Sequence, residues 1–182
     1  IGSKALFTNS TGYYNAALGY HSLYSNTTGF ANTANGNEAL YSNITGTNNT
    51  ANGNYSLKYN TSGSLNTANG SSALQSNTTG NFNTANGYQA LFYNTTGNYN
   101  TANGYDALYN NSTGFSNVAL GTSALNKNTT RSNLVAVGDS ALYNNGVGAT
   151  QNYHAIQNTA IGSKALFNNT KGYSNTALGA DA

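Results

Sequence analysis

The 182-residue chain contains no cysteine, no proline, no methionine and no tryptophan, and charged residues make up only 5% of it. Without cysteine it has no disulfide bond and no thiolate metal site. Its net charge of +2 is not gathered into a basic cluster, which argues against nucleic acid as a partner. No apolar run approaches the roughly 20 residues of a membrane-spanning helix, so we expect no such segment.

The polar character of the chain comes from asparagine, threonine and glycine rather than from charge, and 15 tyrosines and 6 phenylalanines accompany them. Disordered chains are typically rich in charge and poor in aromatic residues. A long disordered linker therefore fits this composition poorly.

An internal repeat organises the whole sequence. Its first residue is a glycine that recurs every 17 residues, then once after 24, then again after 17: Gly2, Gly19, Gly36, Gly53, Gly70, Gly87, Gly104, Gly121, Gly138, Gly162 and Gly179. The consensus, numbered from this glycine, is G-x-x-A-L-x-x-N-T-T-G-x-x-N-T-A-x. Asparagine holds the eighth position from Asn9 to Asn169, and alanine holds the sixteenth from Ala17 to Ala177.

Leucine holds the fifth position in all ten repeats, which predicts a structural ladder at the core or at chain contacts. Its members are Leu6, Leu23, Leu40, Leu57, Leu74, Leu91, Leu108, Leu125, Leu142 and Leu166.

A unit of 17 residues is too short for the common helical repeats, which need about 33 or more, and Gly, Asn and Thr are poor helix formers. We predict an all-β fold, a β-solenoid of about ten 17-residue coils with two short strands per coil. N-T-A-x forms one strand, x-A-L-aromatic the other, and N-T-T-G the turn between them. Each strand residue must donate to the next coil, which explains the absence of proline. Residues 1–182 are read as a single array cut from a longer protein.

One coil carries an insertion. Residues 146–157 account for the interval of 24 in place of 17, and the motifs on both sides keep the repeat. We predict a protruding loop that leaves the stacking of the coils undisturbed. Loops inserted into solenoids often carry binding, so Tyr153 and His154 are candidate partner-binding residues.

A run of asparagines occupies the seventeenth position, where the other repeats carry an aliphatic residue. The run comprises Asn35, Asn52, Asn69, Asn86 and Asn103. These side chains either face water or form an internal ladder in which each amide donates to the next. We favour the internal ladder as a second structural ladder.

Chemistry-bearing residues are scattered. The two histidines, His21 and His154, are far apart in repeat register, and the acids form no assured pair for glycoside hydrolysis. His21 and Glu38 share the third position of successive coils and could touch. The G-G-x-G-x-D pattern of calcium solenoids is missing. We expect no catalytic residue, no cofactor site and no metal site.

Several segments resemble the head repeats of trimeric autotransporter adhesins: N-A-A-L-G at 15–19, N-V-A-L-G at 117–121, V-A-V-G at 135–138, N-T-A-I-G at 158–162 and N-T-A-L-G at 175–179. The chain is also similar to Asn/Thr-rich repeats in large secreted surface proteins of gliding bacteria. The resemblance implies left-handed β-rolls that associate as trimers and attach to cells or surfaces. Two features depart from the family: the N-T-T-G turn lengthens the coil, and the asparagine run replaces the aliphatic residue in five repeats.

We therefore expect a structural repeat segment of an extracellular bacterial fibre or adhesin at the cell surface, which contacts other cells or surfaces and is not an enzyme. Because one coil can bury little, and aromatic residues form a broken stripe at the sixth position, we expect a homo-oligomer. The resemblance favours a trimer, with higher cyclic orders open. Two alternatives are an ice- or crystal-surface-binding protein, suggested by the regular threonines, and a phage-like tail fibre or spike.

Overall fold

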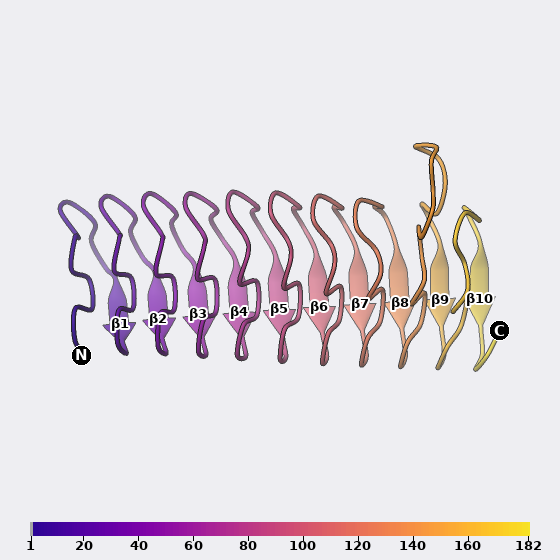
Figure 1. Ribbon diagram of the computed structural model, residues 1–182, viewed down its shortest axis with the longest axis horizontal. Helices are drawn as coiled ribbons and strands as arrows, with labels where there is room; N and C mark the ends of the chain where they lie inside the picture. Colours follow the sequence, from indigo (N-terminus) through magenta and orange to yellow (C-terminus); the bar gives the residue numbers. More distant parts are fainter. Residues whose placement is uncertain (1) are drawn as a thin grey trace.

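The computed structural model describes residues 2–182, and in these residues ten short parallel strands stack in one sheet in chain order (Figure 1), with no helix. The strands are β1 (Ala16–Leu18), β2 (Thr33–Asn35), β3 (Thr50–Asn52), β4 (Thr67–Asn69), β5 (Thr84–Asn86), β6 (Thr101–Asn103), β7 (Val118–Leu120), β8 (Val135–Val137), β9 (Thr159–Ile161) and β10 (Thr176–Leu178). The predicted all-β solenoid of ten coils with a 17-residue period is confirmed.

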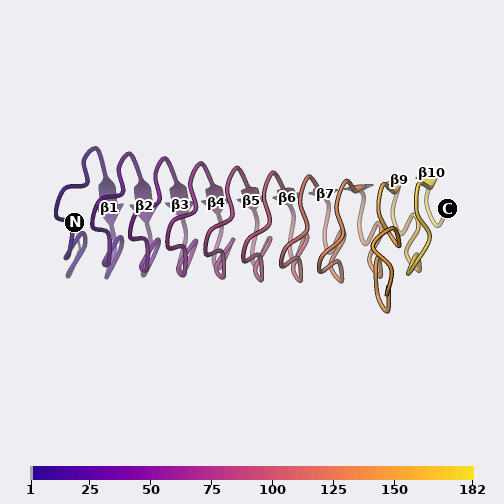
Figure 2. The same cartoon turned by 90° about the horizontal axis from the view of Figure 1, so that it is seen from above.

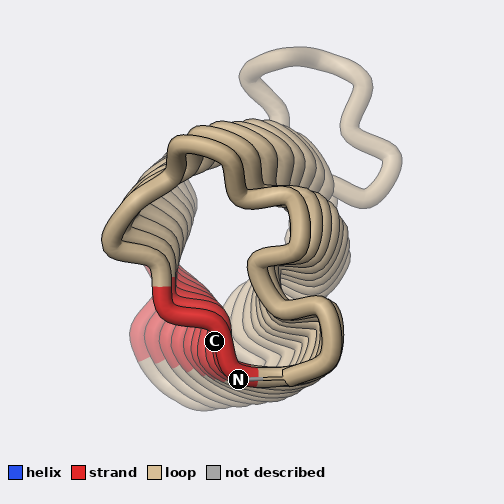
Figure 3. The backbone as a smooth tube through the Cα atoms, turned by 90° about the vertical axis from the view of Figure 1, so that its left-hand side faces the viewer, coloured by secondary structure: helices blue, strands red, loops and turns tan. Residues whose placement is uncertain are grey.

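Equal repeat positions lie above one another throughout the stack. Ala34 pairs with Ala51 and Ala51 with Ala68, and the same register continues along the sheet. Seen along the axis, the coils superpose into one outline with the strands on one side (Figure 3). Neighbouring strands in a sheet lie about 4.8 Å apart, so each coil advances the array by that distance.

Each coil has one strand, not the two that we predicted. The expected second strand, around the leucine of the fifth position, is a series of turns. Glu38 and Leu40 both have φ near 52°, and the same two positions are left-handed in the other coils. Left-handed residues alternating with ordinary ones bend the backbone, whereas a strand needs negative φ at every residue. The segment still bonds to the next coil, as when Leu40 N–H donates to the Ser56 carbonyl at 3.0 Å.

The left-handed positions explain which residue types the repeat accepts. Apart from glycine, 32 of the described residues have positive φ, nearly all at the third, fifth and thirteenth positions, and none is valine, isoleucine or threonine. Branching at Cβ makes this conformation a severe outlier. The fifth position can thus be leucine, which is unbranched at Cβ, but not isoleucine.

The core is a narrow column of leucine flanked by alanine. Leu23 to Leu142, at the fifth position, are fully buried, as are the sixteenth-position alanines from Ala51 to Ala160. The terminal members Leu6 and Leu166 are partly buried and pack against the same cluster. The predicted burial of the leucine ladder is confirmed over the inner coils.

The first-position glycine is required by close contact between coils. Gly53 has φ of 140°, and a Cβ placed on it would collide with the backbone carbonyl of Gly70 in the next coil. The same collision repeats along the array, so this corner of the coil excludes any side chain.

Candidate functional site

Buried asparagines, rather than apolar side chains alone, hold one coil to the next. The eighth-position asparagine is fully buried in every coil from Asn26 to Asn145. The Asn43 amide donates to Oδ1 of Asn26 at 2.8 Å and to the carbonyl of Gly46 in its own turn at 3.0 Å. This ladder satisfies the polar groups that the turn would otherwise bury unpaired.

A second buried ladder runs through the fourteenth position. Oδ1 of Asn49 accepts the backbone N–H of Asn66 at 3.0 Å and its amide at 3.2 Å, while the Asn49 amide donates to the carbonyl of Gly63 at 2.8 Å. The ladder stops at Leu134, which occupies this position in one coil and is itself buried. Sequence reasoning missed both ladders, although the invariance of the eighth position was a signal for the first.

The ladder that we favoured, at the seventeenth position, is not internal. Asn35, Asn69 and Asn103 are exposed, and Asn52 and Asn86 are half-buried. Their side chains point away from the core because they flank the inward alanine of a strand, where successive side chains alternate. Part of the ladder nevertheless exists on the surface: Asn52 donates to Asn69, and Asn69 to Asn86, each at 2.9 Å.

The outer face of the sheet changes character along the array. Strands β2 to β6 present threonine and asparagine. The flanking strands present apolar side chains to solvent: Leu18 is 50% exposed, Leu120 45%, Ile161 41% and Leu178 77%. The fifteenth-position threonine hydroxyls of β2 to β6 have no hydrogen-bond partner within residues 2–182, whereas ninth-position hydroxyls bond to the next coil, as Thr78 does to Thr95.

The aromatic residues form separate short stacks on the surface. At the sixth position Phe7, Tyr24 and Tyr41 stack with ring centroids 5.3 and 5.1 Å apart, and Tyr143 stacks on Phe167 at 5.2 Å. Rings stacked in this way cover one another's faces and present mainly their edges to solvent.

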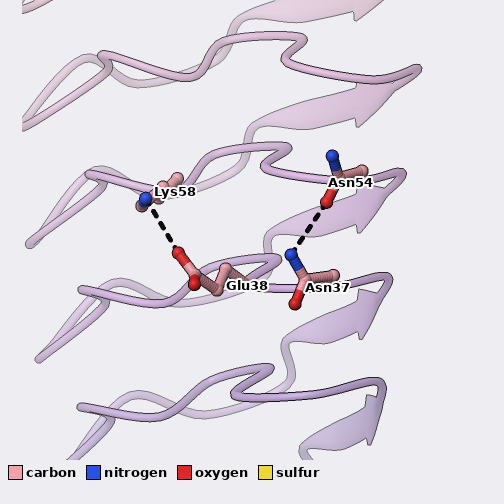
Figure 4. A network of polar contacts seen from close by, with 4 residues as sticks. All are labelled: Asn37, Glu38, Asn54 and Lys58. Atoms are coloured by element: carbon pink, nitrogen blue, oxygen red, sulfur yellow. Dashed lines mark hydrogen bonds and ion pairs between the residues drawn. The ribbon is translucent and has the colours of Figure 1, made fainter.

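The third-position charges pair differently from what we considered. Oε2 of Glu38 lies 2.8 Å from Nζ of Lys58 in the next coil, beside an exposed bond from Asn37 to Asn54 (Figure 4). The hydrogen bond to Glu38 raises the pKa of Lys58. His21 instead stacks on Tyr20, with ring centroids 3.8 Å apart. The contact between Glu38 and Lys58 is a surface ion pair of modest strength.

Residues 146–157 leave the stack as a loop beside β9 (Figures 1 and 2), and β8 and β9 remain in register beneath it. Arg131, in the coil before the loop, stands where the other repeats carry the eleventh-position glycine. Its guanidinium donates to the carbonyls of Ala149 at 2.9 Å and Gln151 at 3.0 Å.

The insertion alters the eighth-position ladder next to it. The Asn145 amide donates to the carbonyl of Ala155 in the loop, at 2.8 Å, and not to the asparagine one coil earlier. Oδ1 of Asn128 is therefore buried without a partner. The ladder resumes in the next coil, where Asn169 donates to Asn145 at 2.8 Å.

The two candidate residues of the loop have different surroundings. Tyr153 is 53% exposed and meets Tyr173 edge to face, with centroids 5.5 Å apart. His154 accepts the N–H of Gln151 at its Nδ1, at 3.3 Å, so it braces the loop. Beside the loop lies a hollow of about 340 Å³ between it and the two preceding coils, lined by Phe115, Thr130, Arg131, Ser132, Asn133, Asn152 and Ile156.

Within residues 2–182 no three His, Asp or Glu side chains gather as metal ligands would. Over the same residues, no helix has the length and apolar character of a membrane span. Comparison of the chain with family models, curated proteins and solved structures finds no match.

Proposed function

We propose that this chain is a structural repeat segment of an extracellular bacterial fibre or adhesin, which displays surfaces for contact with cells and is not an enzyme. The observation that carries the proposal is the continuous register of ten strands, in which every coil bonds to the next through its backbone. Buried asparagines add to these bonds along the array, except at the step into the coil that carries the insertion. Such an array extends in one dimension as coils are added, and each coil is stable only against its neighbours. That is the mechanical property of a shaft or an extended head.

The proposal includes association of the chain with copies of itself, with a trimer favoured by the resemblance noted above. Support comes from the outer face of β1 and β7 to β10, where Leu120, Ile161 and Leu178 are exposed in the same column. Apolar side chains that recur along one face gain free energy when another surface covers them. This face replaces the sixth-position aromatic stripe as the expected contact, because the stripe is divided into self-contained stacks.

The test of association uses substitutions that other repeats of the chain already carry at the same position. Strands β2 to β6 carry asparagine where β7 carries Leu120 and β9 carries Ile161, so a double variant Leu120→Asn, Ile161→Asn keeps a residue that the fold accepts. Sedimentation at micromolar concentration should show an oligomer for the unaltered chain and a monomer for the variant. A control, Lys127→Asn, alters the surface away from the sheet and should stay associated. If the unaltered chain sediments as a monomer, the proposal that it associates with copies of itself is wrong.

One observation favours the ice-binding alternative. The threonine hydroxyls of β2 to β6 have no acceptor in the described residues, and they repeat at regular spacing without any charge among them. Thermal hysteresis decides between the two functions, because a fibre segment produces none. Replacement of Thr67 by valine, which removes only the hydroxyl, should reduce any hysteresis that is found.

A further inference from the structure

We propose that the hollow between the inserted loop and the two preceding coils binds a saccharide, with Phe115 as the platform on which a sugar ring stacks. The proposal adds a ligand class to the contact role proposed above and rests on that role. It begins from the one irregular coil, since an interruption that breaks a buried asparagine ladder at Asn128 costs stability and needs a compensating use.

Phe115 differs from most of the other exposed rings in having no aromatic partner. It occupies the twelfth position, where Phe30 stacks on Tyr13 with centroids 4.8 Å apart. Phe115 is 49% exposed, and no other ring in residues 2–182 contacts it, because its neighbours along the column are Asn98 and Ser132. No aromatic ring therefore covers either face of Phe115, whereas each stacked aromatic has at least one face covered by another ring.

Free polar groups surround this ring. Asn133 and Asn152 are both exposed, and neither amide makes a hydrogen bond within the described residues. The Thr130 hydroxyl is also unbonded, and Ile156 supplies an apolar wall. An amide offers two donors and an acceptor, which suits the alternating donor and acceptor character of vicinal hydroxyls.

The hollow is held open by contacts already present. The Arg131 guanidinium donates hydrogen bonds to the carbonyls of Ala149 and Gln151, and the Ser132 hydroxyl accepts the N–H of Phe115 at 3.0 Å. The loop is thus positioned before any ligand arrives, which lowers the cost of binding. The volume of the hollow, about 340 Å³, lies at the small end of the range for ligand sites, so the hollow fits a short stretch of saccharide.

A saccharide matches these groups better than a peptide does. A pyranose ring offers an apolar C–H face to an aromatic ring and a rim of hydroxyls to amides. The hollow has no carboxylate for a basic side chain, and the cation of Arg131 is turned to the loop carbonyls. The absence of tryptophan from the chain makes the test specific, because Phe115→Trp introduces a single fluorescent reporter at the proposed platform.

The experiment screens the full chain on a printed array of neutral oligosaccharides and then titrates the best-retained one in solution. We expect the Phe115→Trp emission to shift on titration, and the double variant Asn133→Ala, Asn152→Ala to bind at least ten times more weakly. The matched control Phe30→Trp, in the same column but stacked on Tyr13, should not respond.

The inference would be overturned if the chain bound no oligosaccharide on the array, or if it bound an array of peptides instead. Binding that leaves the emission of the Phe115→Trp variant unchanged would overturn it as well. Sedimentation of the same samples reports association separately, so failure of the sugar site can be distinguished from failure of the fibre role.

Discussion

The amide of Asn77 donates to Oδ1 of Asn60 in the preceding coil at 2.7 Å, and the Asn94 amide donates to Asn77 at the same distance. Asn77 also donates to the carbonyl of Gly80 at 3.0 Å, so both of its N–H groups are used and its oxygen is paired. One buried side chain thereby joins three coils and closes its own turn.

Replacement of Asn77 by alanine should lower the free energy of unfolding by at least about 2 kcal/mol, because it leaves buried groups on Asn60, Gly80 and Asn94 unpaired. The matched control is Asn69→Ala, which removes an asparagine from the exposed surface ladder and should cost less than about 0.5 kcal/mol. Thermal and urea unfolding of both variants measure the difference. If both variants lose the same free energy of unfolding, burial of the eighth-position ladder does not strengthen its contribution to stability.

The leucine column should reject a change of shape at constant volume. Leu74 is fully buried with φ of 51°, a conformation that a β-branched residue adopts only at high cost. Leu74→Ile should therefore destabilise by at least about 2 kcal/mol. Leu134→Ile is the control, since Leu134 is equally buried but lacks a positive φ, and such a swap typically costs less than about 1.5 kcal/mol. A control that loses as much as Leu74→Ile would show that shape alone, not backbone conformation, is responsible.

The period, the all-β class and the buried leucines were predictable from invariance alone, because a stack forces equal positions into equal surroundings. The prediction of a second strand in each coil was wrong because alternation of apolar and polar residues does not report the sign of φ. A signal was available: the third, fifth and thirteenth positions never hold threonine, although threonine is frequent at the ninth and fifteenth. The asparagine ladder was sought in the column that changes identity, whereas the buried one lies in the column that never does.

Asp106 should destabilise the fold at neutral pH. Burial raises its pKa, and its Oδ1 is buried with no hydrogen-bond partner. A raised carboxyl pKa means that the folded state holds the proton more tightly, so stability falls as pH rises from the unfolded pKa, about 3.9, through the folded pKa. Asp106→Asn should therefore be more stable than the unaltered chain at pH 7, with the gain absent near pH 3. Melting temperatures across this range check it, and a gain that persists unchanged at pH 3 would contradict the electrostatic cause.

Arg131 and the inserted loop depend on each other. In the other coils a side chain at the eleventh position meets the next coil: a Cβ on Gly97 would collide with the carbonyl of Gly114. Arg131 escapes this because the chain departs from the repeat at Gly146, whose added Cβ would lie 3.0 Å from Cγ of Arg131. The arginine and the insertion are thus one change, in which the loop makes room for the side chain and the side chain fixes the loop.

Arg131→Gly restores the repeat residue, so we expect the array to keep its melting temperature while the loop loses its two charged hydrogen bonds to Ala149 and Gln151. Limited proteolysis should then cut within 146–157 several times faster than in the unaltered chain. Lys127→Gly, which removes an exposed cation from the same coil, is the control and should leave the cleavage rate unchanged. Loss of the fold in Arg131→Gly would mean that the arginine supports the stack itself, and an unchanged cleavage rate would mean that other contacts, such as Asn145 with Ala155, suffice to hold the loop.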